Sequence, residues 1–278
     1  MGRDNRQPYP DSYYSPLVLL WNHIIDFGYW LILGVSVVAY LLECWFTAHK
    51  IFVPSLSVTG LQHVLGMNMN FGMLNAMPGS HGLMLIPDVL LSIFIWMVRL
   101  LCFSFLSVSV GHLLTNMLIL GVFFLMAYWL SIKQYLLFKT WFFGSIGIMA
   151  GYFVIMHLVN FITRGHIYWL NYCANDMTPL MGASVGVLTV VGFVMVLSVV
   201  SMIMTVEDAR DHDMSLSLSD WLCLLPLIIG IAVVWNLGIG QESLNVMFLH
   251  WLGVIVGIIA GIVWFLRFGR DDEEDYSK

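Results

Sequence analysis

The chain of 278 residues contains 60% hydrophobic and only 10% charged residues, whereas soluble globular domains carry about 25% charged residues. This composition excludes a soluble enzyme and a disordered chain. It also excludes a nucleic-acid-binding domain, because 17 Asp and Glu outnumber 11 Lys and Arg and leave no basic surface for phosphates. Cys44, Cys102, Cys173 and Cys223 lie far apart with no CxxC pair, so they predict neither a disulfide framework nor a zinc site.

The first 27 residues predict a cytoplasmic N-terminal segment. The first 20 are mostly polar and contain no short apolar run that ends at a small-residue cleavage site, so we expect no signal peptide. Six apolar stretches follow, and they predict an all-α membrane domain over 28–266, because only helices satisfy their own backbone in lipid. The stretches lie at about 28–46, 112–130, 141–161, 181–204, 221–238 and 244–266. Residues 267–278 predict an acidic cytoplasmic tail.

The orientation follows from the basic residues, which concentrate on the cytoplasmic side of membrane proteins. With the N-terminus inside and six crossings, Lys50, Arg99 and Arg164 fall outside and the other eight fall inside. The inner eight are Arg3, Arg6, Lys133, Lys139, Arg210, Arg267, Arg270 and Lys278. We therefore expect both termini in the cytoplasm, the acidic run EDARDHD (207–213) in an inner loop, and residues 47–110 and 162–179 outside.

The stretch 83–130 is apolar almost throughout and allows two interpretations. Two crossings would leave SVSV (107–110) as the whole loop between them. We favour one crossing, preceded by a long outer loop over about 47–110 that partly re-enters the membrane. The Gly, Asn, Pro and His content between 60 and 87 suits an irregular segment, which is tolerated at membrane depth only against protein or water.

Polar side chains inside a membrane span are costly, so each is a candidate for function. In GHLLTNMLIL, His112 and Asn116 are four residues apart and project from one helix face. In MGASVGVLTVVG, Ser184 lies between Gly182 and Gly186. We expect these two glycines to serve helix packing around the serine.

A third cluster lies in FLHWLGVIVGIIAG, where His250 is followed by Gly253, Gly257 and Gly261. The spacings of 3, 7 and 11 residues put all four positions on one helical stripe. Small residues in such a stripe let another helix come close, so we expect these glycines to serve helix packing as well.

The three clusters share a depth in the six-span topology. The second, fourth and sixth spans all run from outside to inside, and His112, Ser184 and His250 each fall within the first few residues of their span. All three are therefore expected at a similar shallow depth below the outer surface. A hydroxyl, an imidazole and an imidazole–amide pair in one layer supply the parts for acyl transfer.

This arrangement resembles the rhomboid family of intramembrane serine proteases. The family has an HxxxN motif on the second span, a GxSG-type motif opening the fourth, and a His followed by small residues on the sixth. The matching residues are His112, Asn116, Gly182, Ala183, Ser184, His250, Gly253 and Gly257. The run RLLCFSFLSVSVGHLLTN (99–116) also resembles the family's run from a loop Arg to this motif, and the resemblance covers about 95–265.

The resemblance implies a six-transmembrane-helix rhomboid-like bundle with a partly embedded outer loop between the first two spans. It also implies a serine endopeptidase that cuts transmembrane protein substrates with a Ser184–His250 dyad. The Ser184 N–H and the side chains of His112 and Asn116 would form its oxyanion hole. We expect the lipid bilayer as its surroundings, no cofactor, no metal and no nucleic-acid partner. The expected location is a bacterial cytoplasmic membrane.

Three positions depart from the family pattern. Val185 stands where Gly usually follows the nucleophile, Leu188 where a Tyr often supports the catalytic His, and Ser107 where many members have another His. Val185 keeps a second interpretation open, a rhomboid-like pseudoprotease that binds transmembrane helices without cutting. A transporter or channel would predict polar residues through the full membrane thickness, whereas here they cluster in one layer.

Overall fold

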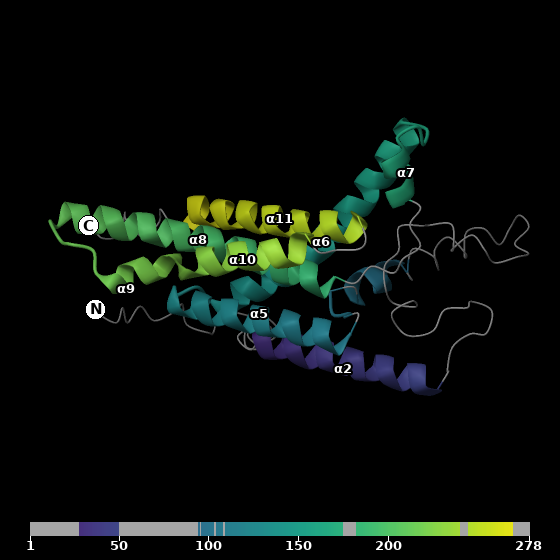
Figure 1. Cartoon of the computed structure of the whole chain (residues 1–278), viewed down its shortest axis with the longest axis horizontal. Helices are drawn as coiled ribbons and strands as arrows, with labels where there is room; N and C mark the ends of the chain where they lie inside the picture. Colours follow the sequence, from purple (N-terminus) through teal and green to yellow (C-terminus); the bar gives the residue numbers. More distant parts are fainter. Residues whose placement is uncertain are drawn as a thin grey trace, which may run out of the picture.

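The computed structural model describes residues 28–49, 94, 96–102, 104–107, 109–174, 182–239 and 244–268. These residues form helices and short connections, with no strand among them (Figure 1). The elements are α2 (Gly28–His49), α5 (Val110–Trp129), α6 (Gln134–Ile162), α7 (Tyr168–Ala174), α8 (Ala183–Asp211), α9 (Leu218–Trp221), the 3-10 turn η3 (Leu222–Leu224), α10 (Leu225–Ile239) and α11 (Leu244–Phe268).

Five helical segments in the described part of the chain are long and apolar enough to cross a membrane. They are Val110–Trp129, Gln134–Ile162, Ala183–Asp211, Leu218–Leu237 and Leu244–Arg267. The expectation of an all-α, multi-pass integral membrane protein is thus confirmed. The first expected span coincides with α2, a helix of 22 residues whose apolar stretch, Gly28–Leu42, is shorter than the others.

Two span boundaries differ from those expected. The third helix starts at Gln134 instead of 141, and the fourth continues to Asp211 instead of ending at 204. The prediction that EDARDHD (207–213) forms a loop was therefore largely wrong, because its first five residues are the last turn of α8. Hydropathy marks where the apolar slab ends, whereas a helix continues into water as long as its backbone bonds are made.

The segment before α5 is more regular than expected. Residues 96–102 are helical, the Trp96 ring contacts that of Phe153 on α6, and Leu100 is buried. A turn at Ser104–Phe105 separates this piece from α5, and the Ser109 side chain caps α5 by accepting the His112 N–H. The expected embedded stretch between 60 and 87 lies outside the described residues.

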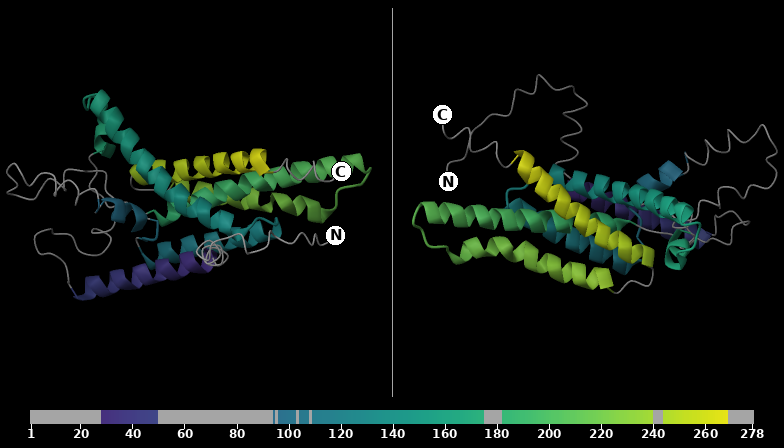
Figure 2. Two further views of the ribbon diagram at one scale, coloured as in Figure 1. Left: turned by 180° about the vertical axis from the view of Figure 1, so that it is seen from behind. Right: turned by 90° about the horizontal axis from the view of Figure 1, so that it is seen from above.

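The central helix of the bundle is α8, which lies between α11 and α10 and also packs against α5 and α6 (Figures 1 and 2). Every residue from Ala183 to Met195 is buried. A helix that is buried on all sides must be apolar all round, and this half of α8 is, apart from Ser184 and Thr189. The C-terminal end of α6 leaves the bundle obliquely together with α7 (Figure 2).

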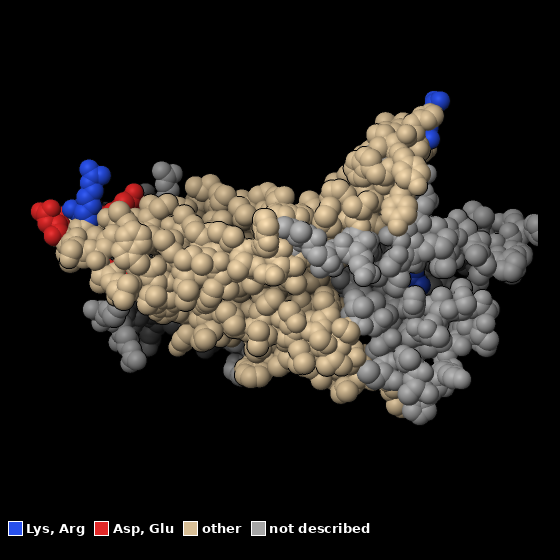
Figure 3. Space-filling model, in the orientation of Figure 1, with Lys and Arg blue, Asp and Glu red and all other residues tan. Residues whose placement is uncertain are grey.

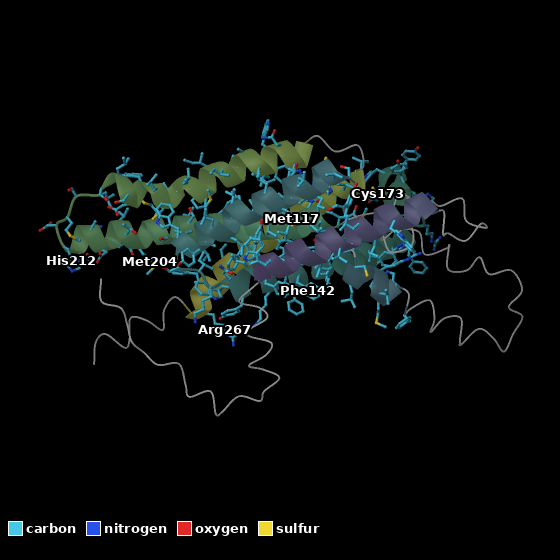
Figure 4. The ribbon with its side chains drawn as sticks, turned by 90° about the horizontal axis from the view of Figure 1, so that it is seen from below. Met117, Phe142, Cys173, Met204, His212 and Arg267 are labelled. Atoms are coloured by element: carbon cyan, nitrogen blue, oxygen red, sulfur yellow. The ribbon has the colours of Figure 1, made fainter. Side chains whose placement is uncertain are left out.

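Charged side chains on the face seen in Figure 3 gather at the ends of the bundle, and a broad uncharged belt covers the middle. Figure 4 places Cys173 at one end and His212 at the other, with Met204 and Arg267 on the His212 side of Met117. This distribution suits a protein that crosses a bilayer, because charges are costly within the hydrocarbon core.

Candidate functional site

The two helices that carry Ser184 and His250 meet through glycine. Gly253 and Gly261 on α11 lie where an added Cβ would press on the carbonyl oxygens of Val185 and Phe193, at 3.0 and 3.1 Å. An added Cβ at Gly257 would collide with the carbonyl oxygen of Thr189. From one contact to the next, the residue number increases by four on both helices, so α8 and α11 run parallel. Their backbones are in contact, as the small-residue stripe predicts.

This contact brings Ser184 and His250 together. Ser184 is the second residue of α8, two positions after the N-terminal cap at Gly182, and His250 lies in the second turn of α11. The Ser184 Oγ is 2.7 Å from the His250 Nε2, and the two residues are 1% and 2% exposed. The distance is that of a hydrogen bond between a nucleophile and its base.

The second ring nitrogen of His250 fixes the direction of that hydrogen bond. Nδ1 lies 2.9 Å from the main-chain carbonyl oxygen of Leu237 on α10. Because a carbonyl only accepts, Nδ1 carries the proton, and Nε2 is left as the acceptor for the Ser184 hydroxyl. The imidazole is thus in the tautomer that a general base needs.

His112 and Asn116 form a pair on α5. The Asn116 amide nitrogen is 3.4 Å from the His112 Nε2. If the amide donates to Nε2, the His112 proton is on Nδ1. This Nδ1 is buried without a hydrogen-bond partner in the described structure, as is the Asn116 Oδ1. The pair therefore holds unused hydrogen-bonding capacity.

The residues that depart from the family pattern are packed into the core. Val185 is 1% exposed, and its side chain joins an apolar cluster with Ile148 and Met149 of α6 and Leu249 of α11. Leu188 is buried too, with its Cβ against the Gly253 position. The branched side chain of Val185 thus fills space between three helices.

Gly182 and Gly186 serve different local purposes. Gly182 is the N-terminal cap of α8, and its carbonyl accepts the Gly186 N–H. An added Cβ at Gly186 would press on the buried indole of Trp141 in α6. Gly186 therefore lets α6 approach the turn of α8 that carries Ser184.

A chain of two hydrogen bonds near the start of α11, about one turn before His250, was missed in the sequence analysis. The Tyr152 hydroxyl donates to the Asn245 Oδ1 at 2.7 Å, and the Asn245 Nδ2 donates to the Cys173 carbonyl oxygen at 3.2 Å. Asn245 is fully buried and lies one residue into α11. This link ties α6, α7 and α11 together, and an amide so near the start of an apolar span could have signalled it.

A second missed pair joins the segment before α5 to α6. The hydroxyls of Ser104 and Ser145, both fully buried, are hydrogen-bonded to each other. Neither residue stood out in the sequence, because a single serine costs little in an apolar segment.

Comparisons of the chain with protein-family models, with curated proteins and with solved structures found no match.

Proposed function

We propose that this protein is an intramembrane serine protease with a rhomboid-like six-helix bundle. The observation that carries the proposal is the hydrogen bond between Ser184 and His250, two residues separated by 66 positions and held by backbone contact between α8 and α11. A serine hydroxyl is a poor nucleophile without a base in hydrogen-bond reach. Here the base is in reach and in the required tautomer.

The chemistry follows the usual two steps of acyl transfer. The Ser184 Oγ attacks the substrate carbonyl carbon while its proton passes to the His250 Nε2. The protonated His250 then gives that proton to the leaving amine as the peptide bond breaks, which leaves an acyl group on Ser184. Water attacks this ester with His250 again as the base, releases the carboxylic acid and restores the serine.

The negative oxygen of the tetrahedral intermediate needs donors that are already in place. The Ser184 N–H belongs to the first turn of α8, where amide hydrogens have no acceptor within the helix. The unpartnered His112 Nδ1–H adds a donor on α5. The Asn116 amide nitrogen has a second hydrogen to donate besides the one that faces the His112 Nε2, whereas its Oδ1 only accepts. One such donor is typically worth about 3–4 kcal/mol of transition-state stabilisation.

The substrates in this proposal are transmembrane segments of other proteins, reached within the lipid bilayer. A regular helix hides its carbonyls in its own hydrogen bonds, so cleavage should favour segments with small or helix-breaking residues near the outer face. Because Ser184 is 1% exposed, a substrate gains access only if neighbouring segments move.

The second candidate is a helix-binding pseudoprotease. Val185 favours it, since a branched side chain beside the nucleophile could crowd a scissile carbonyl. The burial of that side chain among Ile148, Met149 and Leu249 favours the protease instead, because it directs the methyl groups into the core.

The proposal is tested with a fluorophosphonate probe and with a transmembrane substrate that contains helix-breaking residues. The wild type should react with both, and Ser184→Ala should lose both activities by at least about a thousandfold, with normal folding. The matched control is Ser198→Ala, which removes another buried hydroxyl of α8. Retained cleavage in Ser184→Ala, or a folded wild type inert to probe and to several substrates, would exclude the protease.

The proposed orientation has its own test. In a protein whose native cysteines have been replaced, a cysteine at Asn171 in α7 should react with an impermeant reagent outside intact cells. A cysteine at Asp211, the last residue of α8, should be protected until the cells are opened. External labelling at Asp211 would contradict the shared shallow depth of the three motifs.

A further inference from the structure

Two different helices hold the imidazole of His250. Its Nε2 faces the Ser184 hydroxyl on α8, and its Nδ1 faces the carbonyl oxygen of Leu237 on α10. In a catalytic triad the second position belongs to a carboxylate, which fixes the tautomer and stabilises the imidazolium. In this protein a main-chain carbonyl occupies that position.

The place of Leu237 within α10 suits this task. Leu237 is the third residue from the end of the described range of α10, Leu225–Ile239. A carbonyl near the C-terminal end of a helix carries the partial negative charge of the helix dipole. Such a carbonyl both accepts the Nδ1 proton and favours the positive charge that appears when His250 takes the serine proton.

The position of α10 against α8 depends on side chains. Gly230 faces Met195 of α8 so closely that an added Cβ would collide with the methionine side chain. Val234, one turn further, is buried in the same apolar core. Residues 230, 234 and 237 follow the spacing of one helix face, so the contact at Gly230 sets where the Leu237 carbonyl meets His250.

We infer that Leu237 is a positioning residue, whose main-chain carbonyl holds His250 in the tautomer that accepts a proton from Ser184. The packing of α10 on Met195 then decides whether His250 can act as a base. The catalytic consequence rests on the proposed function, whereas the tautomer is a property of the folded protein alone and is measured separately.

The test displaces α10 without changing the dyad. Gly230→Leu inserts a wedge against Met195, and adding Met195→Ala removes the side chain that the wedge strikes. Gly147→Leu in α6 is the matched control, because an added Cβ there has nothing within 4 Å. The tautomer of His250 is read from imidazole nitrogen NMR shifts of histidine-labelled protein, with His250→Gln for assignment, and fluorophosphonate reaction is followed in parallel.

The wild type and Gly147→Leu should both show the Nδ1-protonated tautomer. Gly230→Leu should populate the Nε2-protonated form and slow the probe reaction by more than about tenfold, because a wrong tautomer costs serine proteases far more than that. Adding Met195→Ala should return both readouts towards wild type. An Nε2-protonated His250 in the wild type, or a folded Gly230→Leu protein with both readouts unchanged, would overturn the inference. A tautomer that responds to the wedge in a protein inert to the probe would support the positioning role and exclude the protease.

Discussion

The contacts of α8 with α11 and with α10 differ in kind. Against α11 the backbones touch through Gly253, Gly257 and Gly261, and against α10 the contact is made by side chains such as Met195. Burial differs as well, at 33% of the apolar window of α11 and 17% of that of the span containing α10. A contact between backbones has little freedom to adjust, whereas a methionine side chain adapts readily.

The candidate site draws one component from each contact. The Ser184–His250 pair lies across the backbone contact, where the distance between the reacting atoms is held most firmly. The acceptor that orients His250 comes from α10, the less buried neighbour. The expected result is a dyad of fixed geometry whose protonation depends on a helix that is easier to displace.

The largest effect is expected from breaking the tight contact. Gly257→Leu places a side chain against the main chain of Thr189, which cannot move aside. Overpacking of this kind typically costs about 1–3 kcal/mol, and a displacement of about 1 Å between reacting groups can cost a hundredfold in rate. We expect a lower unfolding temperature in detergent and a loss of fluorophosphonate reaction of about a hundredfold.

Gly34→Leu is the matched control for this substitution, because an added Cβ at Gly34 has nothing within 4 Å. It should leave both measurements near those of the wild type. A Gly257→Leu protein with unchanged stability and labelling would show that the two backbones are not in contact, and the comparison between the two sides of α8 would fail.

A smaller effect on the rate is expected at Val185, the residue after Ser184. Val185→Gly removes a side chain that is 1% exposed and adds a glycine to a helix interior, so unfolding should become easier by about 2–4 kcal/mol. The rate of probe reaction per folded molecule should change by less than about threefold, because no group that acts in the transition state is removed.

Val190→Gly is its control, as it removes another buried valine of α8 away from Ser184. It should lower the stability to a similar extent and leave the rate of probe reaction per folded molecule unchanged. An inert wild type that gains probe reactivity through Val185→Gly would instead assign the chain to the pseudoproteases.

The last effect concerns stability alone, at the N-terminal end of α11. Asn245→Ala removes the side chain to which the buried Tyr152 hydroxyl donates, and removing one partner of a buried hydrogen bond costs about 1–3 kcal/mol. Adding Tyr152→Phe should recover part of this loss, because that hydroxyl is then gone. Asn236→Ala is the control, since Asn236 is exposed and donates to the Ala232 carbonyl of its own helix. Strict additivity of the two substitutions in unfolding measurements would exclude a coupled link.

The spans could be predicted from the sequence because partition into lipid depends on local composition. Their ends could not, as the last turn of α8 shows: Glu207 and Asp208 are charged yet helical, and hydropathy has no term for helix continuation in water. The helical residues 96–102 were missed for a related reason. Their regularity depends on packing, with Trp96 against Phe153 and Leu100 in the core.

The candidate site shows the same division between side-chain and main-chain information. Ser184 could be singled out because it lies among Gly182, Ala183 and Gly186, and His250 because an imidazole is costly inside a span and glycines follow it at helical spacing. The glycine spacing also indicated that another helix comes close. Leu237 could not be singled out, since every residue has a carbonyl and only the end of α10 places this one beside Nδ1. The catalytic roles of these residues stay predictions until activity is measured.

The length of α8 can be compared with the thickness of the membrane. The first charged residue of this helix after Ser184 is Glu207, and the 23 steps between them span about 34 Å at the helical rise of about 1.5 Å per residue. A typical hydrocarbon core is about 30 Å thick, so with Glu207 at one boundary Ser184 lies near the other. A thicker bilayer would draw the serine into hydrocarbon and a thinner one would leave it among the headgroups, which makes lipid chain length a control on how much water the candidate dyad meets.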